Sequence, residues 1–156
     1  MMQLNCLIIL LIRINIMATF DDAFKILKAK EGGYVNDSDD SGGETYCGIS
    51  RRYNLNWEGW DTIDIYKRTY RGTSLNKKLN SDPMLQDLVR KLYKDKYWDI
   101  FELDNIPSQR LAYQMFDTCV NCGSSAAIRF AQAALGENIT GRWTWDLLHK
   151  LAAVKS

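Results

Sequence analysis

Apolar side chains that recur every three or four residues are the feature that most constrains this fold. The clearest run lies between Pro83 and Trp98 and predicts one long helix, because this spacing places all of its members on one helix face. The run comprises Leu85, Leu88, Val89, Leu92 and Tyr93. Alternating, strand-like patterns are weak along the chain, and 156 residues suffice for one compact domain. The sequence therefore predicts a single, mainly α-helical domain.

Caps and glycines divide the rest of the chain into shorter helices. Thr19 and Asp22 make a capping-box pattern that begins the first helix, and the glycine pair at 32–33 ends it. Further helices are predicted at residues 46–54, 57–70, 111–123, 124–136 and 143–154. Connections are predicted at residues 34–45, where a short hairpin fits, at 71–82 and at 101–108.

The N-terminal residues 1–16 are expected to lie outside the fold. Their apolar run, Leu4–Ile12, is too short to span a bilayer, has no basic residue before it and is followed by no A-x-A-like cleavage site. Met17 stands shortly before the first predicted helix. We therefore expect Met17 as the functional start, an extension at 1–16 and the domain at 17–156. The alternative is that residues 1–16 form a degenerate signal peptide or a membrane-surface anchor.

Charge and cysteine content argue against two classes of site. The formal net charge is +1, which does not suit a strongly basic nucleic-acid-binding protein. Cys119 and Cys122 have the C-x-x-C spacing of zinc and redox sites, but a zinc site needs a second pair of ligands, and His149 is the only histidine of the sequence. The two thiols are therefore predicted to pack within a helix, and we expect no metal and no cofactor.

The segment AKEGGYVNDSDDSGGETYCGIS, residues 29–50, holds the strongest candidates for chemistry. Glu31 stands in the last turn of the first predicted helix, where the negative end of the helix dipole and any burial raise the pKa of a carboxyl. A carboxyl that stays protonated near neutral pH can act as a general acid. Gly32 and Gly33 beside it leave room for a bulky ligand to approach.

A second carboxyl follows in the polar loop. Asp40, nine residues after Glu31, is expected to stay ionised, and the hydroxyl of Thr45 is a candidate to hold a water. One protonated and one ionised carboxyl are the pair that glycoside hydrolysis uses. Two other interpretations stay open. In the first, Glu31 simply ends a solvated helix. In the second, Asp37–Gly42 begins a calcium loop, although Gly48 stands where such a loop needs a glutamate.

This segment resembles the signature of glycoside hydrolase family 108, the N-acetylmuramidases found as phage endolysins and secretion-linked lysozymes. The signature is E-G-G-Y-x-N-D-P-x-D-x-G-G-x-T-x-x-G-I. The matching positions are Glu31-Gly32-Gly33-Tyr34, Asn36-Asp37, Asp40, Gly42-Gly43, Thr45 and Gly48-Ile49. The chain departs from the signature at Ser38, where the family has proline, and at Cys47, where the family has an aromatic residue.

The second half of the chain is similar to the same family. Residues 97–136 contain the pieces YWD, FD, VN, a following glycine and QAALG in the family's order. That half is often described as a peptidoglycan-binding domain. The resemblance therefore implies a lysozyme-like helical fold with a catalytic half at 18–95 and a peptidoglycan-binding-like half at 96–154. The segment at 140–148 departs from the family, because it lacks the usual Asp-Gly turn.

The resemblance implies cleavage of the β-1,4 bond between N-acetylmuramic acid and N-acetylglucosamine in peptidoglycan. Glu31 is then the catalytic acid. A looser likeness to phage lysozymes makes Asp40 the second carboxylate, with Asp37 as its rival, and adds Thr45. Four more residues are candidates for sugar contacts, with packing in the scaffold as the alternative for each. Tyr34 and Tyr46 are candidates to line the sugar cleft, and Asn36 and Asn121 are candidates to hydrogen-bond the N-acetyl or hydroxyl groups.

Two other functions stay open at this point. A lytic transglycosylase uses one acid/base on a similar fold, and a non-catalytic peptidoglycan-binding or secretion-accessory protein uses none. Whether hydrolysis retains or inverts the anomeric configuration is also open, because that depends on the separation of the two carboxyls. A muramidase of this kind is expected to be a monomer made in the bacterial cytoplasm that reaches the cell wall through a holin or a dedicated secretion system.

Overall fold

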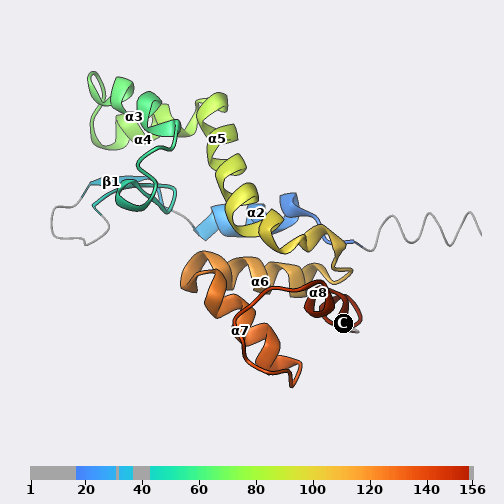
Figure 1. The fold of residues 1–156 in the computed structure, drawn as a ribbon. Coiled ribbons are helices and arrows are strands. Elements are labelled where there is room, and N and C mark those ends of the chain that lie inside the picture. The colour runs from blue at the N-terminus through green and yellow to red at the C-terminus, as the bar shows by residue number, and fades with distance from the viewer. Residues whose placement is uncertain (1–16, 31, 37–42, 155–156) are drawn as a thin grey trace, which may run out of the picture. The chain divides into compact units, whose positions relative to one another are not determined.

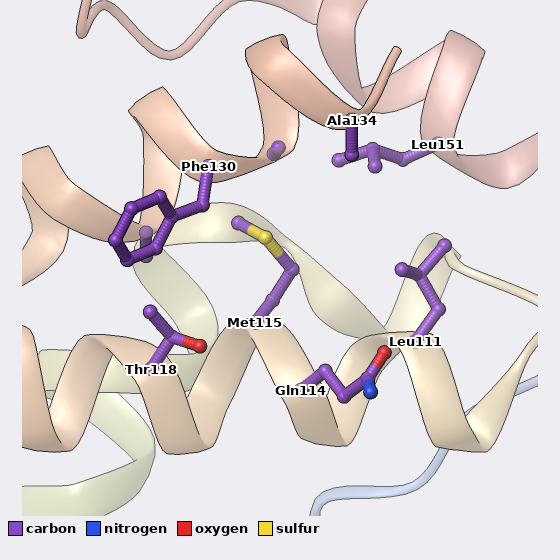
Figure 2. A pocket seen from close by; sticks show the side chains of 9 residues that line it. Leu111, Gln114, Met115, Thr118, Phe130, Ala134 and Leu151 are labelled. Carbon is purple, nitrogen blue, oxygen red and sulfur yellow. The ribbon is translucent and has the colours of Figure 1, made fainter.

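The structure is a computed structural model that describes residues 17–30, 32–36 and 43–154. Helices form most of this part of the chain, together with one small antiparallel sheet (Figure 1). The main elements in chain order are α2 (Phe20–Lys30), β1 (Tyr34–Asn36), β2 (Glu44–Tyr46), β3 (Ile49–Ser50), η1 (Arg51–Tyr53), α3 (Gly59–Lys67), α4 (Gly72–Asn80), α5 (Pro83–Tyr93), η2 (Lys94–Trp98), η3 (Asp99–Phe101), η4 (Leu103–Asn105), α6 (Gln109–Cys122), α7 (Ser124–Ala134) and α8 (Trp145–Ala152). The mainly α fold and the hairpin after residue 31 are therefore confirmed. No helix in the described ranges is both long and apolar enough to cross a membrane.

The chain forms two compact units. The first extends from Ile26 to Tyr93 and contains the sheet together with α3, α4 and α5. The second joins the residues up to Lys25 to those from Lys94 onward, and it contains α6, α7 and α8. We call them the sheet unit and the helical unit.

In the sheet unit, β1, β2 and β3 follow one another as an antiparallel meander. Tyr34 of β1 pairs with Tyr46 of β2, and Thr45 of β2 pairs with Ser50 of β3. The core of the unit comes largely from α3, α4 and α5, each of which buries apolar side chains about one helical turn apart, as an amphipathic helix does. These side chains are Trp60, Ile63, Leu75, Leu79, Leu85, Val89 and Tyr93.

The helix predicted at residues 46–54 is wrong. The chain there completes β2, turns at Cys47-Gly48 and continues as β3 and the short 3-10 helix η1. The φ angles of Cys47 and Gly48 are 47° and 75°, in the left-handed region that a right-handed helix does not contain. The hydroxyl of Tyr93 donates a 2.8 Å hydrogen bond to the Cys47 carbonyl. This bond fastens α5 to the turn between the two strands.

The polar connection predicted at residues 71–82 is also wrong, because Gly72–Asn80 forms α4. Leu75 and Leu79, four residues apart, are 3% and 0% exposed and make its buried stripe. Polar side chains fill the rest of this helix, so that its composition resembles that of a loop. The spacing of the two leucines was the helical signal.

The core of the helical unit is built on three aromatic rings. Phe20, Trp98 and Phe116 are buried, and the centroids of each pair of rings lie 5.7–5.8 Å apart with interplanar angles of 68–82°. Such edge-to-face contacts bring the positive edge of one ring to the negative face of another. The indole nitrogen of Trp98 donates a 2.9 Å hydrogen bond to Asp104, so this buried polar group is satisfied.

The boundaries of α6 follow its local signals. The side chain of Ser108 accepts a 3.3 Å hydrogen bond from the Leu111 amide at the start of the helix. Gly123, with φ of 85°, ends it, as predicted. Cys119 is buried in this helix, which confirms its packing role, but Cys122 is exposed, so the same prediction was wrong for the second thiol.

Candidate functional site

Five of the predicted site residues can be placed. Glu31, Asp37 and Asp40 lie outside the described residues. Tyr34 and Asn36 are on β1 of the sheet unit, and Thr45 and Tyr46 are on β2 of the same unit. Asn121 is near the end of α6 in the helical unit. The sheet therefore brings four candidates together.

Asn76 of α4 holds the strand that follows the glycine pair. Its Oδ1 accepts a 2.6 Å hydrogen bond from the Tyr34 amide, and its Nδ2 donates a 3.4 Å bond to the Tyr34 carbonyl. One side-chain amide thus pairs with both backbone groups of Tyr34 on an edge strand, as a neighbouring strand would. Gly33 permits this approach, because a Cβ at Gly33 would lie 2.2 Å from Asn76 Oδ1.

Replacing Gly33 with alanine is expected to lower the free energy of unfolding by about 1–3 kcal/mol. The new methyl group displaces the Asn76 amide, which leaves the backbone of Tyr34 without its partners. Gly32→Ala is the matched control, since nothing lies within 4 Å of a Cβ built there. Urea denaturation measures both variants. Equal stabilities of the two would contradict the role assigned to Asn76.

Glu44, the first residue of β2, is the centre of an ionic network. Its side chain is only 13% exposed. Oε1 accepts a 2.7 Å hydrogen bond from the Tyr34 hydroxyl and a further bond from the Lys67 ammonium. Oε2 accepts a 2.7 Å bond from the Arg51 guanidinium. Donors from β1, η1 and α3 thus meet on one carboxylate and join the sheet to the helix.

Asp64 of α3 extends this network. Nη1 and Nη2 of Arg51 donate bonds of 2.8 and 2.6 Å to its two carboxylate oxygens, which is the bidentate geometry of strong arginine–carboxylate pairs. The same guanidinium lies 5.1 Å from the centroid of the Trp60 ring. The Lys67 ammonium lies 3.6 Å from Asp64 and 5.4 Å from the centroid of the Tyr34 ring. Both cations are therefore held between carboxylates and aromatic faces.

The network keeps its carboxylates ionised. Burial raises the pKa of Glu44, but the three hydrogen bonds that it accepts, first that from Lys67, outweigh burial and leave the pKa below its ordinary value. The hydrogen bonds from Arg51 lower the pKa of Asp64. A carboxylate that is ionised and already saturated with donors is a poor general acid. Glu44 is therefore an anchor of the sheet and not a proton donor.

Tyr46 is a core residue, and its expected place at the wall of a sugar cleft is wrong. Its side chain is 0% exposed. The hydroxyl donates a 3.0 Å hydrogen bond to Asn80 and accepts a 2.8 Å bond from Gln86. Burial raises the pKa of this hydroxyl far above its ordinary value. The residue fastens β2 to α4 and α5, which is the packing alternative.

The positions of Thr45 and Asn121 leave their roles as predictions. Thr45 is half-buried on β2, and its hydroxyl donates a 3.3 Å hydrogen bond to the Gly43 carbonyl. Asn121 is exposed on α6, and its amide donates a 2.8 Å bond to the Asp117 carbonyl one turn earlier. The bond of Asn121 is local to its own helix.

A pocket of about 430 Å³ adjoins the network. Residues of β1, α3, α4 and the segment between the two helices line it: Tyr34, Asn36, Lys67, Arg71, Gly72, Leu75 and Asn76. Two predicted sugar-binding residues, Tyr34 and Asn36, thus lie in one cavity with two cations. Within the described part of the chain, no group of three or more histidine, cysteine or acidic side chains is placed to hold a metal ion.

A family model and a solved structure match this chain. The family model described as glycosyl hydrolase 108 matches residues 24–123, which include the whole of the sheet unit. Among solved structures, the chain is similar to the structure of SagA from Brucella abortus, with a TM-score of 0.58 and 20% identity, over 87% of this chain and 70% of that one. At this identity the likeness concerns the fold. None of the curated proteins matches the sequence.

Proposed function

Because this chain belongs to glycosyl hydrolase family 108, we propose that it is an N-acetylmuramidase. Membership makes it a glycoside hydrolase directed at peptidoglycan. The proposal adds the bond and the reaction, which are the β-1,4 bond between N-acetylmuramic acid and N-acetylglucosamine and its cleavage by water.

The observation that carries the proposal is the ordered match from Glu31 to Ile49, which lies wholly within the family range 24–123. In the proposed reaction, Glu31 protonates the leaving glycosidic oxygen. Asp40, with Asp37 as its rival, either activates the water or stabilises the positive charge on the sugar ring. Thr45 orients that water. The separation of the two carboxyls decides between retention and inversion of the anomeric configuration.

The described contacts support this assignment by fixing the chain next to the acid. Gly32 and Gly33 join Glu31 to Tyr34, whose backbone is bound by Asn76 and whose hydroxyl is bound by Glu44. A general acid acts only within hydrogen-bond reach of the leaving oxygen, and small displacements of it cost large factors in rate. We therefore assign a positioning role to Asn76 and Glu44.

Mass spectrometry of the soluble products from purified peptidoglycan tests the reaction type. A hydrolase adds one water at each cleaved bond, whereas a lytic transglycosylase leaves 1,6-anhydromuramic ends that lack it. We expect hydrated products from the wild-type protein. Anhydro products would assign the chain to the transglycosylases, and bound peptidoglycan without soluble products would make it a binding protein.

The proposed substrate places the action of the protein at the cell wall. Export from the cytoplasm through a holin or a dedicated secretion system is therefore part of the same proposal. Lysis of producing cells should therefore depend on the holin or the secretion system. Cell lysis and fractionation, compared with and without these genes, test the export proposal. Lysis at full rate after removal of every holin and secretion gene would contradict it.

A further inference from the structure

Arg71 lines the pocket beside the sheet as a cation without a carboxylate partner among the described residues. Its Nη1 donates a 2.7 Å hydrogen bond to the Tyr70 carbonyl and a further bond to the Lys67 carbonyl. These bonds hold the guanidinium in place, but they neutralise no charge. Its Nε and Nη2 make no hydrogen bond to any residue in the described ranges. A guanidinium with free donors in a fixed fork suits a planar anion such as a carboxylate.

The second cation of the pocket, Lys67, is already balanced. Its ammonium is bonded to Glu44 and lies 3.6 Å from Asp64. Arg71 therefore carries the unbalanced positive charge of the pocket. Of the seven described residues that line the pocket, none is acidic. An anion that enters this pocket meets Arg71 directly and meets no described carboxylate in the wall itself.

Neutral donors complete the lining. The side chain of Asn36, the last residue of β1, is exposed and lines the same pocket. Gly72 begins α4, so the positive end of that helix dipole also faces this region. The Asn76 amide, by contrast, is occupied with the backbone of Tyr34. Among the described residues, the pocket thus offers one cation without a carboxylate partner, with the exposed side-chain amide of Asn36 nearby.

From these contacts we propose that the pocket binds a carboxylate of the peptidoglycan strand, with Arg71 as its principal ligand. The inference rests on the proposed function, because it takes peptidoglycan as the substrate. Tyr34, in the pocket wall, follows Glu31 by three residues, and three residues of chain span at most about 11 Å. Three residues of chain at most therefore separate the pocket wall from the proposed acid, and we propose that the pocket binds a substrate charge near the cleaved bond.

Peptidoglycan offers this carboxylate from two sources. The stem peptides carry carboxylates, and the lactyl group of N-acetylmuramic acid becomes one when the peptide is removed. A neutral chitin disaccharide carries neither. Binding through Arg71 therefore distinguishes peptidoglycan from neutral glycans that have the same backbone linkage.

Isothermal titration with a disaccharide-peptide, which contains no muramidase bond left to cleave, tests the inference. Arg71→Gln is expected to raise the Kd about 10-fold, because a charge-assisted bidentate contact is lost. Arg71→Lys keeps the charge but not the fork, and should lose less. Arg68→Gln is the matched control, since Arg68 is an exposed arginine outside the pocket lining. Equal affinities of Arg71→Gln and Arg68→Gln for the disaccharide-peptide, and also for the peptide-free disaccharide, would overturn the inference.

Two further ligands identify the source of the carboxylate. A loss in Arg71→Gln that is confined to the disaccharide-peptide assigns the stem peptide. A loss confined to the peptide-free disaccharide, which has a free lactyl carboxylate, assigns the lactyl group, and a loss with both ligands shows that Arg71 accepts a carboxylate from either source. An equal loss with the neutral chitin disaccharide would overturn recognition of a carboxylate, as would the absence of wild-type binding to all three ligands.

Release of reducing ends from peptidoglycan by the wild-type protein reports separately on the proposed function. No release, together with binding that depends on Arg71, would contradict the proposed muramidase activity and support carboxylate binding in the pocket. Release with binding that ignores Arg71 would refute the pocket and keep the muramidase.

Discussion

Glu31→Gln is expected to lower kcat/KM for peptidoglycan by about 10²–10⁴-fold, because the amide cannot donate the proton that a general acid supplies to the leaving oxygen. The substitution keeps the size and shape of the side chain. Its thermal midpoint should therefore stay close to that of the wild type. Initial rates of reducing-end release at several substrate concentrations measure the effect.

Glu58→Gln is the matched control for this experiment. Glu58 is an exposed glutamate that directly precedes α3 in the sheet unit, and it belongs neither to the proposed catalytic pair nor to the ionic network. Its activity should equal that of the wild type. Full activity in Glu31→Gln would remove the proposed acid, and an equal loss in both variants would show that the effect is not specific to Glu31.

Glu44→Gln is expected to lower the free energy of unfolding by about 2–4 kcal/mol, because it removes one partner of a mostly buried ion pair network. The new amide also places a donor against Lys67 or Arg51, both of which are donors themselves. Urea denaturation measures the change. Asp146→Asn is the control, since the Asp146–Lys150 pair is exposed and such pairs contribute about 1 kcal/mol or less. Similar losses in the two variants would contradict the central place of Glu44.

The contribution of Glu44 to stability should depend on pH in one direction. Its folded-state pKa lies below the ordinary value of 4.5, so below that pH the unfolded state binds more protons than the folded state. The stabilisation is therefore present above about pH 4.5 and is lost as the pH falls through the folded-state pKa. The stability difference between wild type and Glu44→Gln should narrow on acidification. A difference that widened would reverse the assigned sign.

Elements with local signals were predicted well. The end of α6 at Gly123 was predicted from the conformational freedom of glycine, a signal that acts within a few residues. Its start, Gln109 after the Ser108 cap, lies shortly before the predicted start at residue 111. The helix predicted at 46–54 failed because Cys47, a residue without glycine's freedom, takes a positive φ of 47° in the turn. Gly48 beside it is a hairpin-turn signal, but the cysteine itself carries no signal for that conformation. Tertiary contact with Tyr93 accompanies it.

The ionic network could not be predicted from the sequence. Glu44 was one acidic residue among several in a polar segment, and its partner Lys67 lies 23 residues away. Asn76 is 42 residues from Tyr34, inside a stretch predicted to be a connection. Pairings at such separations depend on how the elements pack, and a single sequence carries no local signal of them. The ordered match around Glu31 was accessible because it depends on consecutive residues.

The identity of the new reducing sugar tests the central claim most directly. Peptidoglycan digested by the wild-type protein is reduced with borohydride, hydrolysed and analysed for the sugar alcohol at the new ends. A muramidase leaves N-acetylmuramic acid at the reducing end, so muramitol is the predicted product. Glucosaminitol would show that the other glycosidic bond of the strand is cut, and it would contradict the proposed function.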